Sequence, residues 1–255
     1  MSRIEPPSTY SLYVPHEGDF PDLEPGAVHV WRLRVPVENN DKPPRLERLA
    51  ACLNPEEQTR AARFHFDADR HRFAWTRGLL RTLLAYYVHT TPDRIQFGVG
   101  AKGKLHLTPA HAGLLFNVSH SHQWAFLALS RDRELGVDVE HHRPLRHDLF
   151  GIADRFFAPA EVATLRALPP EAQEAAFFRI WSRKEAYIKA TGEGVSAGLD
   201  TFEVSSGEEA AVTLRVYGRP DEDQRWVMRS LEAGPDYAAA ICIEGQAATI
   251  TVRDW

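Results

Sequence analysis

The alternation of apolar and polar residues predicts a strand near the start of the chain. Between residues 27 and 35, Trp31, Leu33 and Val35 alternate with two arginines, as in a strand that buries one face. Residues 69–88 instead show spacings of three and four, which predict a helix with one stripe against the core. That stripe consists of Phe73, Thr76, Leu80, Leu83, Leu84 and Tyr87.

Capping sequences mark where further helices begin. In Asn54-Pro55-Glu56-Glu57, asparagine suits the cap, proline suits the first turn, and the second glutamate can reach back to the cap. The sequence Ala158-Pro159-Ala160-Glu161 predicts another helix start, and a longer helix is expected over residues 171–190.

The predicted elements form two similar series. After the first helices, short strands are expected near residues 95–99, 114–119 and 124–129. A strand at 135–140 and two helices then precede strands near 201–204, 212–217, 225–231 and 237–243. Trp75-Thr76-Arg77 and Trp181-Ser182-Arg183 hold matching places in the two series. We therefore expect a duplicated α+β unit, a pseudo-dimer of residues 1–134 and 135–255 with a ligand cleft between the halves.

Composition, cysteine spacing and net charge indicate what kind of protein this is and where it is expected. Of 255 residues, 44% are hydrophobic and 25% are charged, which is ordinary for a globular chain. Cys52 and Cys242 fit no metal spacing, so reduced thiols are expected. Residues 1–26 lack the apolar core of a signal peptide, and no apolar run has membrane-spanning length, so we expect a cytoplasmic protein. A net charge of −5 argues against nucleic-acid binding.

Two carboxylates share one face of the predicted strand Gly136-Val137-Asp138-Val139-Glu140. Positions two apart on a strand point to the same side, so Asp138 and Glu140 repel each other unless a cation lies between them. Carboxylate oxygens suit Mg²⁺, and a solvated acidic face is the alternative. The flanking valines favour a strand that packs on its other side.

A third carboxylate lies on the helix predicted over 171–190. Glu185 and Lys189 are one helical turn apart and can form a surface ion pair of little consequence. Together with Lys184, however, they also supply the carboxylate and cations that a magnesium–phosphate site needs.

Three other polar segments suit an anionic ligand and also have plain structural interpretations. Ser119 and His120 end a predicted strand, where they can donate to phosphate or belong to a turn. The turn Gly100–Leu105 lets a ligand approach, or is an ordinary hairpin. Basic residues near the first helices suit phosphate or solvated helix faces: Arg60, Arg63, Arg70, His71, Arg72, Arg77 and Arg81. Motifs of serine hydrolases, P-loop enzymes and zinc sites are not found in the sequence.

In this order, the segments resemble the broad-specificity 4′-phosphopantetheinyl transferases of the surfactin-synthetase-activating type. The likeness extends from about Asn54 to Ala190 and includes Phe116 to Ser121, Gly136 to Glu140 and Trp181 to Lys189. It implies two similar α+β halves with the active site between them. Leu105 stands where that family commonly has proline, and the first 26 residues have no counterpart that we can place.

The resemblance implies a metal site and a reaction. Asp138, Glu140 and Glu185 would bind Mg²⁺, with Mn²⁺ as an alternative. A serine of an apo acyl or peptidyl carrier protein would attack the β-phosphorus of coenzyme A, with Glu185 as the base. Lys189 would stabilise the departing phosphate of adenosine 3′,5′-bisphosphate.

The resemblance also implies where coenzyme A is held. Lys184 and Lys189 would lie beside the pyrophosphate with Ser119, and Lys104 would lie next to the adenine. The 3′-phosphate would be held by Arg60, Arg72 and His120. The carrier protein is expected to dock near residues 145–158, where Arg146, Arg155, Phe156 and Phe157 mix basic and apolar side chains.

Two other classes of function fit part of the pattern. A magnesium-dependent phosphohydrolase acting on a nucleotide or coenzyme A would use the same carboxylates without any carrier. A non-catalytic module that binds coenzyme A or a carrier would need no metal-bound base. A duplicated chain supplies both walls of its own cleft, so we expect a monomer.

Overall fold

The computed structural model describes residues 22–35, 44–108, 113–143, 149–194, 198–246 and 248–255. Most of the polar segment before residue 27, and Arg146 in the expected docking segment, lie outside these described residues. Within them, no helix is both long enough and apolar enough to cross a membrane.

The first series of elements runs from residue 27 to residue 130. In order, they are β1 (Ala27–Arg34), α1 (Pro44–Ala51), α2 (Pro55–Ala62), α3 (Asp67–Tyr87), η1 (Pro92–Arg94), β2 (Phe97–Val99), β3 (Leu105–Leu107), β4 (Leu115–Ser121) and β5 (Trp124–Ser130). The capping box predicted for α2 is present, because Asn54 Oδ1 accepts from the Glu57 amide at 2.8 Å and Glu57 Oε2 accepts from the Asn54 amide at 3.0 Å.

The second series repeats this plan. In order, its elements are β6 (Leu135–His141), α4 (Leu149–Phe156), α5 (Pro159–Ala167), α6 (Pro170–Thr191), η3 (Leu199–Thr201), β7 (Phe202–Val204), β8 (Ala211–Val212), β9 (Leu214–Val216), α7 (Pro220–Arg225), β10 (Trp226–Ser230), β11 (Tyr237–Glu244) and β12 (Thr249–Asp254). Helix α6 ends at Gly192, whose φ of 69° is the left-handed conformation that glycine adopts most easily.

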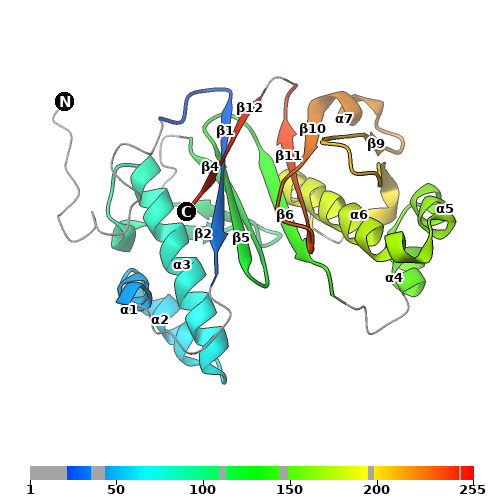
Figure 1. Cartoon of the computed structure of the whole chain (residues 1–255). Coiled ribbons are helices and arrows are strands. Elements are labelled where there is room, and N and C mark those ends of the chain that lie inside the picture. The colour runs from blue at the N-terminus through cyan, green and yellow to red at the C-terminus, as the bar shows by residue number, and fades with distance from the viewer. Residues whose placement is uncertain (1–21, 36–43, 109–112, 144–148, 195–197, 247) are drawn as a thin grey trace.

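The strand order confirms the predicted duplication. One sheet has the order β12-β1-β5-β4 and the other has the order β6-β11-β10-β8, so β1-β5-β4 corresponds to β6-β11-β10. Each long helix is followed by a small two-stranded sheet, β2-β3 after α3 and β7-β9 after α6. Figure 1 shows the two sheets side by side, with α3 and α6 on opposite outer sides.

The last strand departs from the predicted division of the chain. Strand β12 pairs in parallel with β1, in the sheet of the first half, with Ala27 opposite Thr249. Arg32 and Asp254 add an ion pair of 2.6 Å across these strands. Strand β12, which was not among the strands expected from the sequence, therefore lies in the second part of the predicted division but completes the sheet of the first half.

The core has three layers, one outside each sheet and one between them. Helix α3 packs on the first sheet and α6 packs on the second. The central layer contains Val28, Val30, Phe126, Ala128, Leu135, Val137, Val139, Ile241 and Ile243. Because both faces of β6 are covered, its side chains alternate between the central layer and the side of α6.

Candidate functional site

The candidate site lies where β4, β6 and α6 meet. Val137 and Val139 are 0% and 1% exposed in the central layer, which confirms that β6 packs on its valine face. The opposite face directs Asp138 toward α6, where Lys189 contacts it. Helix and strand approach closely because Gly136 has no side chain, since a Cβ there would lie 2.2 Å from the Ala186 carbonyl oxygen.

Asp138 is the buried centre of the site, with 2% of its surface exposed. Its Oδ1 accepts from Lys189 Nζ at 2.6 Å and from Ser119 Oγ at 2.8 Å. Lys189 Nζ also donates to Ser119 Oγ at 3.1 Å. Burial raises the pKa of Asp138, and the Lys189 ammonium opposes this shift. Among the described residues, Asp138 Oδ2 is buried without a hydrogen-bond partner.

Burial and the negative charge of Asp138 raise the pKa values of two further carboxylates, Glu140 and Glu185. Burial, followed by the Asp138 charge, raises the pKa of Glu140 to about 7, although Ser121 donates a 3.2 Å hydrogen bond to it. Burial also raises the pKa of Glu185; Lys189 opposes this shift and Asp138 adds to it. Groups with such perturbed protonation, gathered at one place, are typical of active sites.

Strands β4 and β6 are joined by side chains instead of a backbone ladder, since the pairings of these described strands lead elsewhere. Asn117 Oδ1 accepts from the Val137 amide at 2.9 Å, and Ser119 Oγ donates to Asp138. Ser121 Oγ accepts from the His141 amide at 3.0 Å. We call these hydrogen bonds the β4–β6 seam. They fix the position of β6, and with it Asp138 and Glu140, along β4.

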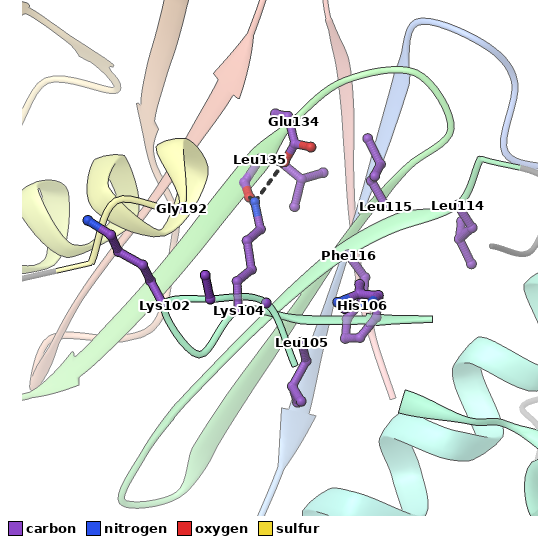
Figure 2. Close-up of a pocket in the computed structure, with 12 residues that line it drawn as sticks. Lys102, Lys104, Leu105, His106, Leu114, Leu115, Phe116, Glu134, Leu135 and Gly192 are labelled. Carbon is purple, nitrogen blue, oxygen red and sulfur yellow. Dashed lines mark hydrogen bonds and ion pairs between the residues drawn. The ribbon is translucent and has the colours of Figure 1, made fainter. Parts of the chain in front are cut away.

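A cavity of about 310 Å³ lies beside these groups, between the two halves. Its lining comes from the turn before β3, from β4, and from α6 and the loop after it: Lys102, Gly103, Lys104, Leu105, Phe116, Asn117, Val118, Glu185, Ile188, Lys189, Gly192 and Gly194. The predicted cleft between the halves is therefore present. A neighbouring pocket of about 290 Å³ shares Lys104 as a wall (Figure 2).

Lys184 is not part of this site. Its ammonium is buried beside Glu161 at 2.8 Å and donates to the carbonyl oxygens of Leu199 and Phe202 at 2.7 and 2.6 Å. These three bonds use all three N–H groups of the lysine. The expectation that Lys184 lies beside the pyrophosphate is therefore wrong, because consecutive helical residues point about 100° apart and Glu185 already faces the cavity.

The residues expected at the 3′-phosphate lie on elements of the first half, outside the described cavity wall. The Arg60 guanidinium lies 5.2 Å from the centre of the Phe73 ring, and Arg72 Nη1 lies 3.4 Å from Asp69 Oδ1. Within the described part of the chain, Arg72 Nε is buried without a partner. His120 is exposed on β4, next to the buried Ser119. None of these basic residues is in the cavity wall formed by the described residues.

Sequence reasoning missed two members of the β4–β6 seam. Asn117 and Ser121 lie in the segment Phe116 to Ser121 but received no site role from the sequence, yet both form hydrogen bonds to β6. The available signal was their spacing, because positions 117, 119 and 121 share one face of a strand. Arg81 was likewise among the basic candidates for an anion site. Its side chain is instead buried in the first half, where Nε donates to Glu57 Oε2 at 2.6 Å.

The carboxylates of Asp138, Glu140 and Glu185 suit a hard divalent cation, although they do not form a complete coordination site. In the described part of the chain, no group of three His, Cys, Asp or Glu side chains is positioned to hold a metal. The unpartnered Asp138 Oδ2 and the raised pKa of Glu140 nevertheless show carboxylate oxygens beside which a further cation would be favourable. Mg²⁺ needs only one or two protein carboxylates when phosphate and water complete its shell.

Perturbed carboxylates and a lysine beside a cavity between two similar α+β halves are typical of an enzyme active site. Two family models match the chain: "4'-phosphopantetheinyl transferase, N-terminal" over residues 40–132, and "4'-phosphopantetheinyl transferase superfamily" over residues 134–242. The chain belongs to the 4′-phosphopantetheinyl transferase family, as the relatives below also show.

Curated relatives match most of the chain. The 4′-phosphopantetheinyl transferase HetI of Nostoc sp. is 38% identical over 220 residues, which cover 86% of this chain and 88% of the relative. A 4′-phosphopantetheinyl transferase of Bacillus subtilis is 34% identical, and the transferase Sfp of Bacillus subtilis strain 168 is 30% identical. Each of these two matches covers 77% of this chain and 84% of the relative. The resemblance proposed from the sequence is thereby confirmed.

Proposed function

We propose that this chain transfers the 4′-phosphopantetheine moiety of coenzyme A to a serine of an apo acyl or peptidyl carrier protein. The products are the holo carrier and adenosine 3′,5′-bisphosphate. The family membership supports this reaction, and the single structural observation that carries it is the contact of Lys189 and Ser119 with the buried Asp138. A cation, a donor and a carboxylate are thus gathered beside a cavity between the halves.

Coenzyme A binding is divided between the two halves. Lys189 Nζ and Ser119 Oγ are the groups proposed to meet the pyrophosphate, because both border the carboxylates. The 3′-phosphate is proposed to meet Arg60, Arg72 and His120, for which the partnerless Arg72 Nε offers support. Guanidinium groups suit such a doubly charged anion because they bind its oxygens in a bidentate manner.

Asp138, Glu140 and Glu185 are the residues proposed to hold Mg²⁺, with Mn²⁺ as the alternative. When bound, such a cation offsets the charge of the pyrophosphate and of the developing transition state. Lys189 already neutralises Oδ1 of Asp138, which leaves Oδ2 as the oxygen in need of a partner among the described groups.

Glu185 is the proposed base. Burial raises its pKa, so its carboxylate binds a proton more readily than an exposed glutamate does. It takes the proton from the carrier serine hydroxyl as that oxygen forms a bond to the β-phosphorus. The bond from this phosphorus to the bridging oxygen breaks, and the oxygen stays with the 5′-phosphate of the departing adenosine 3′,5′-bisphosphate. Lys189 Nζ donates a hydrogen bond to that phosphate. The walls of the cavity orient the substrate and exclude water.

The proposed docking surface for the carrier includes fewer residues than the sequence suggested. Phe157 is only 2% exposed and belongs to the core of the second half. Arg155 is exposed, and its guanidinium lies 5.1 Å from the centre of the half-buried Phe156 ring. This pair remains a candidate contact for an acidic carrier helix. Action as a monomer in the cytoplasm is part of the same proposal.

Intact-protein mass spectrometry of an apo carrier incubated with this chain, coenzyme A and Mg²⁺ tests the reaction. We expect the carrier to gain one phosphopantetheine, with no gain in EDTA or with Asp138→Asn. The matched control is Asp254→Asn, which changes a surface aspartate that is paired with Arg32. Hydrolysis of coenzyme A without a carrier would favour the phosphohydrolase, and binding without turnover would favour the non-catalytic module.

A further inference from the structure

We infer that Lys104 is a clasp between the two halves, a positioning residue that sets the width of the cavity, and that its ammonium does not bind the substrate. This inference rests on the proposed function for its catalytic consequence. The cavity has the Lys102–Leu105 turn on one side and α6 on the other, and Lys104 is the side chain that connects them.

The Lys104 ammonium is fully engaged within the protein. It lies 2.7 Å from Glu134 Oε2 and donates to the carbonyl oxygens of Leu135 and Ala190, each at 3.2 Å. Three acceptors satisfy the three N–H groups of an ammonium. Figure 2 shows the side chain extending from its turn to Glu134 and Leu135, with Gly192 of the α6 terminus nearby. A lysine held in this way has no N–H left for a ligand.

The acceptors belong to the two elements that carry the reactive groups. Leu135 begins β6, three residues before Asp138, and Ala190 directly follows Lys189 on α6. The Ala190 carbonyl is in the last turn of α6, where carbonyl oxygens lack helical partners and a cation is favourable. Lys104 therefore ties a turn of the first half to both elements of the second half that form the site.

The turn that carries Lys104 is itself well defined. The Gly100 amide donates to the Lys104 carbonyl oxygen at 2.8 Å, and the Gly103 amide donates to the Gly100 carbonyl oxygen at 2.9 Å. Gly103 has a φ of 89°, which permits this tight reversal. Because these two hydrogen bonds close the turn, anchoring its lysine also positions the Lys102 and Leu105 parts of the cavity wall.

Removal of Glu134 should change coenzyme A affinity in opposite directions under the two interpretations of Lys104. If Lys104 bound the anionic coenzyme A, Glu134 would compete for it, and removal of Glu134 would tighten binding. If Lys104 is a clasp, Glu134 holds its ammonium in place, and removal of Glu134 loosens the cavity wall and weakens binding. The Lys104 and Glu134 side chains are 24% and 44% exposed, so both can be changed without opening the core.

The experiment is calorimetric titration of coenzyme A, with Mg²⁺, into the full chain and its Glu134→Gln, Lys104→Met and doubly changed variants. We expect both single variants to raise Kd roughly fivefold to twentyfold. The double variant should be no weaker than the single ones, because one interaction is removed in each case. Glu208→Gln, an 87% exposed glutamate, is the matched control and should bind normally.

Amide hydrogen exchange of the ligand-free proteins separates this inference from the proposed function. We expect the 98–106 hairpin to exchange about tenfold faster in both single variants, whether or not coenzyme A binds. Unchanged exchange, or tighter coenzyme A binding by Glu134→Gln, would overturn the clasp. If the wild-type chain bound no coenzyme A while the hairpin still loosened, the proposed function would fail and the clasp would stand. Glu134→Gln alone decides the matter if Lys104→Met does not fold.

Discussion

Lys189 Nζ lies 2.6 Å from Oδ1 of Asp138, and this contact joins the last turns of α6 to the buried face of β6. The carboxylate is almost fully buried, whereas the lysine side chain is 28% exposed toward the cavity. One cation thus neutralises a carboxylate inside the protein and, after its bonds to Asp138 and Ser119, keeps one N–H for a substrate. The β4–β6 seam holds the carboxylate, and Gly136 allows the helix to approach it.

Replacing Lys189 tests this contact. We expect Lys189→Met to lower kcat about 10²–10³-fold at saturating coenzyme A, because a positioned cation is lost from the transition state. Steady-state carrier modification measures the change. Lys102→Met, which removes an exposed lysine from the opposite cavity wall, is the comparison and should have a smaller effect. Equal losses in the two variants would show that only the charge of the cavity matters.

The raised pKa of Glu140 predicts how stability depends on pH in the absence of a divalent cation. Its carboxyl titrates near 4.5 in an unfolded chain and at about 7 in the folded one, so the folded state binds the proton more tightly. The free energy of unfolding should therefore fall as pH rises from about 4.5 to 7, by at most about 3.4 kcal/mol. The raised pKa values of Asp138 and Glu185 act in the same direction.

Urea denaturation in EDTA at pH 5, 6, 7 and 8 measures that dependence. Glu140→Gln removes the titrating group and should reduce the loss of stability between pH 5 and pH 8. Its stability should exceed that of the wild type at pH 8, where the wild-type carboxylate is charged. The same pH dependence in both proteins would rule out Glu140 as its source.

Gly136→Ala tests the close contact of β6 and α6. An added Cβ would lie 2.2 Å from the Ala186 carbonyl oxygen and 2.3 Å from the Ala190 amide nitrogen, both of which are backbone atoms. We expect a loss of about 1–3 kcal/mol in unfolding free energy, because the helix must shift. Turnover should also fall, since Lys189 moves with α6 away from Asp138. Normal stability with normal turnover would contradict this packing.

Lys184 should act on stability and not on binding. Lys184→Met leaves the buried Glu161 carboxylate without its cation, which typically costs about 3–5 kcal/mol. Protein that remains folded at low temperature should bind coenzyme A with nearly wild-type Kd. Thermal unfolding and calorimetric titration of the same sample measure both effects. Weak binding with an unchanged melting temperature would restore the pyrophosphate role that the resemblance implied.

Ser121 tests the β4–β6 seam. Ser121→Ala removes a hydrogen bond to Glu140 and a bond from the His141 amide. We expect the concentration of Mg²⁺ needed for half-maximal turnover to rise several-fold, because Glu140 loses its fixed orientation. Ser121→Thr keeps the hydroxyl and should recover most of the loss. Thr164→Ala, on the exposed side of α5, is the control. An unaltered Mg²⁺ requirement in Ser121→Ala would argue against this role.

Much of the fold could be predicted from local sequence. The stripe of apolar positions in α3, the capping box of Asn54 and the valine face of β6 depend only on residues close together in the chain. The repeated order of elements predicted two similar halves, and the cavity between them follows from their packing. The acidic face of β6 and the Glu185–Lys189 turn of α6 could be recognised because each lies within one element.

Which faces of these elements meet depends on the packing of the whole chain. Periodicity shows that Asp138 and Glu140 share a face, but the packing of α6 on β6 determines that Lys189 contacts Asp138. The same limit explains why Lys184 was misplaced, and why neither the pairing of β12 with β1 nor the clasp of Lys104 was foreseen. Local sequence fixes the direction of a side chain within its own element. The partner it reaches depends on contacts between residues far apart in the chain, which no local pattern contains.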